Sequence, residues 1–217
     1  MKLLLQQKYP PNKHWIKKIS RDNSIVVPLF YNYKIGESVM KIYFKNLLGH
    51  FSTITRHRHL VIAHSKRAGI LWQGLFHDLS KYSPSEFFIG AKYYLGNKSP
   101  NEKERQLFGY SSAWLHHKGR NKHHFEYWSD YDLQTREIKP VPMPPKYIAE
   151  MFCDRVAASK IYQGENYTDS HPLEYFMKSK ATRLIHPETS DLLENLLRIL
   201  AENGEDAAFA EIRNMLK

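Results

Sequence analysis

The sequence predicts an all-α fold, a helical bundle of about six to nine helices with a short irregular N-terminal appendage. Apolar residues recur at helical spacing from Met40 onward, two Ser-Pro-x-Glu segments have the composition of helix starts, and alternating strand patterns are scarce. The 217 residues, 42% of them hydrophobic, can fill one core. We therefore expect an appendage over residues 1–39 and one helical domain over residues 40–217.

The first 39 residues mix lysines and prolines with one β-prone run, SIVVPLF, and lack helical periodicity. The leucines after Met1 are too few for a signal-peptide core, and no run of 18 apolar residues could span a bilayer. The single cysteine, Cys153, excludes an internal disulfide and suits a reducing compartment. We expect a cytoplasmic protein with no membrane partner.

The first long helix is expected to begin at Met40 and to break at Gly69. Seven residues make nearly two helical turns, so a continuous helix places every third or fourth residue on one face. That face holds His50, Ile54, His57, Val61, His64 and Ala68. His59 lies about 200° from His57 and belongs to the other side.

Further helices follow along the chain. Ser83 and Ser99 each precede a proline and, three positions on, a glutamate, which is typical of a capped helix start, and we interpret Glu86 as the capping-box residue. The segment PPKYIAEMFCDRVAASKIYQ predicts a helix that ends at Gly164, and HPETSDLLENLLRILAEN predicts an amphipathic helix that ends at Gly204.

The chain contains twelve histidines, and most of them cluster. Imidazole nitrogens and carboxylate oxygens together suit zinc, iron or manganese rather than calcium. No short zinc-finger spacing is present, so ligands must converge from separate helices. Besides His57, the candidate ligands are His77 and Asp78 in GLFHDLSKYSP, His116, His117, His123 and His124 in LHHKGRNKHHFEYW, and Asp154 in MFCDRVAASK.

Each candidate also has a structural explanation. A histidine on an apolar face is more often a hydrogen-bonded core residue than a ligand, and His50 or His64 could replace His57. A carboxylate among apolar neighbours, such as Asp154, could be satisfied by an ion pair. The basic segment HHKGRNKHH could be a solvated loop, and periodicity does not show which histidine of each pair faces inward.

The order of these segments resembles the HD superfamily of metal-dependent phosphohydrolases, an all-α fold named for its His-Asp pair. HRHLV from His57 resembles the first ligand helix, LFHDLSK the end of the His-Asp helix, and MFCDRVAASK the last aspartate helix. The paired histidines are also similar to the HD-GYP phosphodiesterase branch, although no GYP triplet follows. HDLSKYSPSEF, LHHKGRNKHHFEYW and EMFCDRVAASK look closer still to a bacterial and phage family of unassigned function.

The resemblance implies an HD-like metal-binding domain with one or two divalent transition-metal ions (Mn, Fe, Zn, Ni or Co). One ion would be held by His57, His77, Asp78 and Asp154. Asp78 would bridge to a second ion held by two or more of His116, His117, His123 and His124. Lys81 and Arg120 would be catalytic and contact the phosphoryl oxygens of a phosphorylated small-molecule substrate, which a metal-activated water attacks. Alternatively, Lys81 forms only an ion pair with Asp78 or Glu86.

Three functions follow as hypotheses. The first is a metal-dependent phosphohydrolase of a nucleotide or other phosphate ester. The second is a di-iron oxygenase, since some proteins of the HD fold activate dioxygen. The third is a nucleic-acid or nucleotide-binding protein with a structural or vestigial metal site. The net charge of +10, from 32 Lys and Arg against 22 Asp and Glu, favours anionic partners in each case. The substrate, the metal and the oligomeric state stay open.

Overall fold

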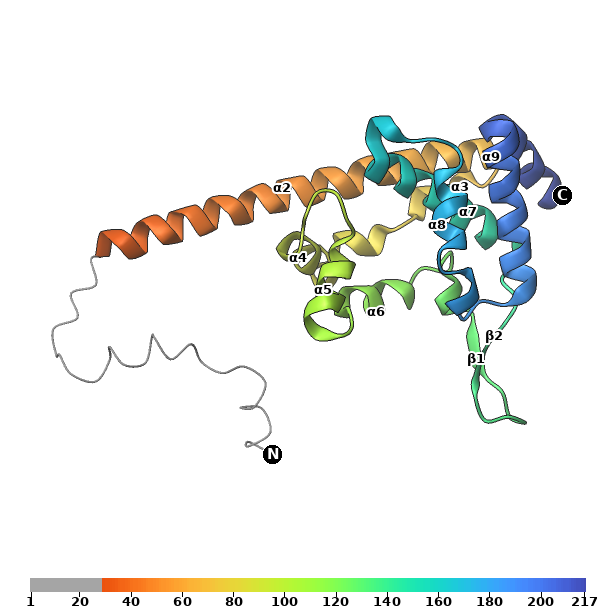
Figure 1. The fold of residues 1–217 in the computed structure, drawn as a ribbon, viewed down its shortest axis with the longest axis horizontal. Coiled ribbons are helices and arrows are strands. Elements are labelled where there is room, and N and C mark those ends of the chain that lie inside the picture. The colour runs from red at the N-terminus through yellow and green to blue at the C-terminus, as the bar shows by residue number, and fades with distance from the viewer. Residues whose placement is uncertain (1–28) are drawn as a thin grey trace. The chain divides into compact units, whose positions relative to one another are not determined.

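The computed structural model describes residues 29–217, and within them it contains eight α-helices and one short hairpin (Figure 1). The prediction of an all-α fold is confirmed. The α-helices are α2 (Leu29–Ala68), α3 (Leu71–Phe76), α4 (Pro84–Lys92), α5 (Pro100–Phe108), α6 (Ser112–Lys118), α7 (Pro145–Gln163), α8 (His171–Met177) and α9 (Pro187–Met215). Short 3-10 helices are η1 (Leu79–Tyr82), η2 (Phe125–Tyr127), η3 (Gly164–Asn166) and η4 (Lys180–Thr182).

Helix α2 begins at Leu29, ahead of Met40, where helical periodicity starts. The expected appendage therefore overlaps this helix over residues 29–39, and its other residues lie outside the described part of the chain. Each residue added to an existing helix gains one backbone hydrogen bond. A helix can therefore extend beyond the apolar stripe that packs against the rest of the protein.

Residues Tyr43–Lys217 form one compact unit. Its core lies where α7 packs against α8 and α9, with the last turns of α2 beside them (Figure 1). The largest fully buried side chains there include Phe152, Phe176 and Phe209. Burying one such side chain contributes roughly 1.5–3 kcal/mol, and this core fixes α7 against α2.

The buried face of α2 agrees with the predicted stripe. All six residues from His50 to Ala68 on that stripe are at most 7% exposed. His59, on the opposite side, is exposed. The prediction that this helix carries histidines into the interior is confirmed.

Most helix boundaries also agree with the sequence. α2 ends at Ala68 before Gly69, which has a positive φ of 83°, and α7 ends before Gly164. The predicted end at Gly204 is wrong in one respect, because the chain kinks there (φ 81°, ψ 177°) and α9 then continues to Met215. Glycine permits this local break without ending the helix.

The capping-box prediction is wrong, although helices do begin at Pro84 and Pro100. Neither Ser83 nor Ser99 caps its helix with its side chain. The Ser83 hydroxyl lies 3.1 Å from the Ser85 hydroxyl instead. Proline at the first position starts these helices, since it presets φ and needs no hydrogen-bond acceptor.

One element was not predicted. Strands β1 (Ser129–Tyr131) and β2 (Ile138–Pro140) pair antiparallel, with Ser129 opposite Pro140. The hairpin connects the segment that carries His123 and His124 to α7. Among the described residues, no helix has both the length and the apolarity to cross a membrane.

Candidate metal centre

Three segments bring the first group of side chains together. His57 comes from α2 and Asp154 from α7, while His77 and Asp78 follow the end of α3. Asp78 has a positive φ of 54°, a left-handed conformation that aspartate adopts more readily than most residues. This turn ends α3 and starts η1, and it leaves both His77 and Asp78 about 1% exposed.

The first group consists of His57, His77, Asp78 and Asp154, whose ligand atoms all lie within 4.8 Å of one another. Nε2 of His57 lies 3.0 Å from Oδ1 of Asp154, and Nε2 of His77 lies 3.1 Å from Oδ2 of Asp78. Asp154 is the most accessible member, with 17% of its side chain exposed. The group is therefore buried but reachable at one edge.

The second group shares Asp78 and adds His117, His123 and His124. Oδ1 of Asp78 lies 3.2 Å from Nε2 of His117 and 3.4 Å from Nε2 of His123. Because Oδ2 faces the first group and Oδ1 the second, this one carboxylate lies between two sets of donors.

The atoms that face this centre are buried and lack hydrogen-bond partners. They are Nε2 of His57, His77, His117, His123 and His124 and both carboxylate oxygens of Asp78. A buried polar atom without a well-aligned hydrogen bond costs roughly 1–3 kcal/mol, and an ion bound among these seven atoms would offset that cost. Imidazole nitrogens and carboxylate oxygens are donors to transition metals, and these residues fit one or two such ions.

Glu150, on α7, supports both groups. Its Oε1 accepts hydrogen bonds from Nδ1 of His77 at 2.9 Å and from Nδ1 of His123 at 3.0 Å. Burial alone would raise the pKa of Glu150, but the hydrogen bonds from His123 and His77 lower it to about 2. When an ion is bound, a proton on Nδ1 would leave Nε2 of each ring to face the ion.

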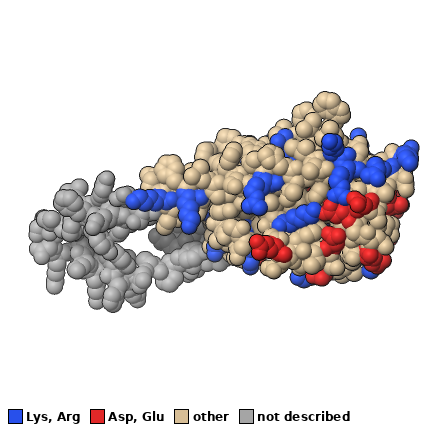
Figure 2. All heavy atoms as spheres, turned by 90° about the horizontal axis from the view of Figure 1, so that it is seen from above, with Lys and Arg blue, Asp and Glu red and all other residues tan. Residues whose placement is uncertain are grey.

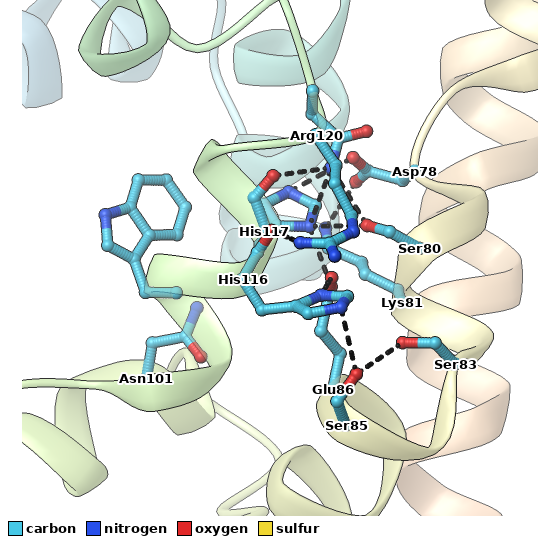
Figure 3. A network of polar contacts seen from close by, with 12 residues as sticks. Asp78, Ser80, Lys81, Ser83, Ser85, Glu86, Asn101, His116, His117 and Arg120 are labelled. Carbon is cyan, nitrogen blue, oxygen red and sulfur yellow. Dashed lines mark hydrogen bonds and ion pairs between the residues drawn. The ribbon is translucent and has the colours of Figure 1, made fainter.

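Glu86, on α4, has the same relation to α6. Its carboxylate lies 2.8 Å from Nδ1 of His117 and 2.6 Å from Nδ1 of His116, and Figure 3 shows it reaching from α4 toward both rings. The capping role predicted for Glu86 is thus replaced by a contact with histidines. Nε2 of His116 lies 3.1 Å from the Ser85 hydroxyl, so His116 is placed outside both groups.

The two central carboxylates are ionised. Burial alone would raise the pKa of Asp78, but the charges of His77 and Lys81 hold it well below its ordinary value. Burial likewise opposes ionisation of Asp154, while the nearby imidazoles of His57 and His77 lower its pKa well below the ordinary value. Negative charge in the centre is therefore available to a cation.

The two residues predicted to contact a phosphate lie at the edge of the centre (Figure 3). Nζ of Lys81 lies 2.5 Å from Oδ2 of Asp78, and 29% of the Lys81 side chain is exposed. Burial opposes its protonation, but Asp78 and Asp154 raise the pKa of Lys81, which keeps the ammonium charged. Arg120 is exposed and donates a hydrogen bond to the His116 carbonyl at 3.3 Å.

Comparison with known protein families assigns this chain to one of them. Residues 46–199 match a family described as a family of unknown function (DUF5662). The chain belongs to this family. No curated protein and no solved structure matches it. The matched range includes both groups of candidate ligands.

The other buried histidines of α2 in this DUF5662 chain lie apart from the centre. Burial, with a smaller effect of Lys81, lowers the pKa of His50 to about 4, and its ring packs against Tyr94. Nδ1 of His64 donates to the Cys153 carbonyl at 3.3 Å. Neither takes the place of His57.

Glu150 and Glu86 are the two supporting residues that the sequence did not reveal. A signal existed for Glu150, which lies four residues before Asp154 and therefore on the same side of α7. No local signal distinguishes Glu86 from a capping glutamate, because its histidine partners lie about 30 residues away along the chain.

Proposed function

We propose that this DUF5662 protein is a metal-dependent phosphohydrolase acting on a nucleotide or another phosphate ester, with a centre related to that of the HD superfamily. The observation that carries the proposal is the position of Asp78. Its two oxygens face separate donor groups, and Oδ2 also contacts the partly exposed ammonium of Lys81. A shared carboxylate with a cation at the open edge suits a phosphate that approaches from solvent.

The first donor group would hold one ion. A second ion would be held by His117, His123 and His124, and Asp78 would contact both ions. Mn, Fe, Zn, Ni and Co all accept these donors. When bound, such ions act as Lewis acids on phosphoryl oxygens and make water nucleophilic near neutral pH. Glu150 and Glu86 fix the ring orientation of three of the histidines, which keeps the donors in place without rearrangement.

Two cationic side chains would bind the phosphate. Lys81 would offset charge on a phosphoryl oxygen near Asp78, and Arg120, with its planar guanidinium, would contact another from the exposed loop after α6. The net charge of +10 would draw anionic substrates toward the protein.

A second candidate function is nucleic-acid binding along α2. Residues 43–77 contain five Lys and Arg and no Asp or Glu, and Lys45, Arg56 and Lys66 are exposed. Figure 2 shows Lys and Arg side chains spread over the face seen from above. Such a surface would bind phosphodiester backbones with a steep salt dependence that removal of His77 leaves unchanged.

The test begins with elemental analysis of the full chain and of His77→Ala. One or two transition-metal equivalents per chain, reduced in the variant, together with metal-dependent hydrolysis of p-nitrophenyl phosphate or a nucleotide, would support the phosphohydrolase. Iron with a visible absorption band that responds to reductant, and no hydrolysis, would instead support a di-iron oxygenase. A wild-type chain that takes up none of the five metals would refute both.

A further inference from the structure

Two arginines of the described chain pack against one aromatic ring, and one of them adjoins a candidate metal ligand in the sequence. Arg155 follows the candidate ligand Asp154 on α7, and Arg183 lies between η4 and α9. In the described part of the chain, neither guanidinium forms an ion pair with an aspartate or glutamate. Arginines in the same unit do pair elsewhere, as Arg67 does with Glu205 and Asp206.

Both guanidinium groups pack against one aromatic ring. Their Cζ atoms lie 5.7 Å (Arg155) and 5.2 Å (Arg183) from the ring centroid of Phe176, a fully buried residue of α8. Burial and then the charge of Arg183 lower the pKa of Arg155 to about 10. Two positive charges are thus held close together, where they repel each other.

Several donors of this pair have no acceptor. Nε of Arg155 and Nη1 of Arg183 are buried without a hydrogen-bond partner. The contacts that exist are weak: Nη2 of Arg155 lies 4.0 Å from the Met151 sulfur, and Nη2 of Arg183 lies 3.4 Å from the Tyr175 carbonyl. Buried charged donors are normally paired, so the arrangement points to an acceptor from outside the chain.

The nearby carboxylate does not neutralise the pair. Glu126 is within electrostatic range of Arg155, Arg183 and Lys118, yet it forms no ion pair with them and its Oε2 is buried without a hydrogen bond. Asp154 is the other carboxylate within range of Arg155, so these three cations exceed the two carboxylates by one positive charge.

Both arginine side chains are partly exposed, and Arg183 borders a groove. Arg183 lines an open groove of about 460 Å³ between α8, η4 and α9. The other cation of that groove, Lys180, is already paired with Glu194 and Asp191. Arg183 is therefore the cation lining this groove that has no carboxylate partner among the described residues.

We propose that Arg155 and Arg183 bind a second anionic group of the substrate, a phosphate or a carboxylate, while the phosphate ester that is cleaved lies at the metal centre. This inference rests on the proposed function and adds that the substrate carries two separated anionic groups. Neighbouring Cα atoms are about 3.8 Å apart, so the backbone of Arg155 directly adjoins that of Asp154. The planar guanidinium fork suits the oxygens of either anion.

The test counts phosphate sites on the full-length metal-loaded protein by calorimetric titration with inorganic phosphate. We expect two phosphates per chain, one of which is lost in Arg183→Gln while metal content and thermal unfolding stay as in wild type. Because charge-assisted hydrogen bonds are lost, that site should weaken by about tenfold or more. Arg155→Gln should remove the same site, and Arg198→Gln, which removes an arginine paired with Glu194, should leave both sites intact.

The outcomes separate this inference from the proposed function. Phosphate binding that is identical in wild type and in both arginine variants would overturn the subsite. Retention of the arginine-dependent phosphate in a protein that binds no metal would refute the proposed function alone. Competition by acetate at the arginine-dependent site would identify a carboxylate as its preferred group, and its absence would identify a phosphate.

Discussion

His57 and His64 lie on the same buried face of α2, two turns apart, yet they have different partners. They are 7% and 3% exposed, so burial does not separate them. Nδ1 of His64 is hydrogen-bonded to the Cys153 carbonyl, and its Nε2 lies 3.4 Å from Lys160, which pairs with Glu205. Nε2 of His57 has no hydrogen-bond partner and faces Asp78 and Asp154.

Helical periodicity therefore determines which residues of α2 are buried, but it does not determine which of them bind a ligand. Around His64, polar groups pair within the protein, which is typical of a structural network. Around His57, imidazole nitrogens and carboxylate oxygens converge without well-aligned hydrogen bonds, which is typical of a site that binds a cation. The opposing elements, α7 in both cases, decide between these roles.

The strongest test of the comparison is Asp78→Asn, which removes the charge shared by both donor groups. Asparagine tolerates the left-handed backbone, so the chain should fold. We expect the affinity for added Mn or Zn to fall at least about 100-fold, measured by competition with a chromophoric chelator. Asp206→Asn, an exposed carboxylate far from the ligands in the sequence, is the control. Wild-type affinity in Asp78→Asn would exclude Asp78 as a ligand.

The next test asks whether Glu150 links the two donor groups. Glu150→Gln weakens the hydrogen bonds to His77 and His123, so the affinity of both ions should fall by about 10–100-fold. Glu86→Gln affects His117 and should weaken one ion only. The measurement is a two-site titration with Mn or Zn. Equal behaviour of the two variants would contradict a bridging role for Glu150.

A third test concerns His64, the histidine whose polar partners lie within the protein. His64→Ala removes a buried ring and its hydrogen bond to the Cys153 carbonyl, and the free energy of unfolding should fall by about 1–2 kcal/mol. Metal content should be unchanged, whereas His57→Ala should reduce it. Chemical denaturation and elemental analysis of the two variants measure both effects. Loss of metal in His64→Ala would show that the two histidines do not have separate roles.

The smallest expected effect concerns the ion-pair network beside His64. Burial alone would raise the pKa of Glu205, but hydrogen bonds from Lys160 and Arg67 lower it below its ordinary value. The stabilisation by Glu205 is therefore complete above the ordinary carboxyl pKa and is lost as the pH falls through the lowered value. It should amount to less than about 1 kcal/mol, since Arg67 is partly exposed.

The measurement for this prediction compares wild type with Glu205→Gln between pH 7 and 3. The difference in the free energy of unfolding should be constant down to about pH 5 and should shrink below that pH. A difference that grows on acidification would mean that the carboxylate is not stabilised by its cations.

Sequence reasoning predicted the parts of this protein that depend on local periodicity. The buried stripe of α2, the break at Gly69 and the isolated Asp154 on α7 all follow from spacing along a helix. The supporting carboxylates Glu150 and Glu86 could not be assigned in that way, because their partners are distant in sequence.

The choice between His116 and His117 also required the structure. Adjacent helical residues point about 100° apart, so the rotation of α6 decides which one faces inward. Glu104 of α5 contributes to that rotation, since it accepts hydrogen bonds from the Ser111 hydroxyl at 2.6 Å and from the Ser112 backbone at 3.1 Å. The orientation of α6 thus depends on a contact that helical periodicity does not predict.

The left-handed backbone at Asp78 also limits how this position can change over evolution. Most side chains would be strained by about 1–2 kcal/mol in that conformation, whereas glycine and asparagine are tolerated. A lineage that no longer needs the activity should therefore replace Asp78 by asparagine or glycine rather than by alanine or glutamate. Asparagine or glycine at this position would then mark a lost metal centre in related sequences that keep the fold.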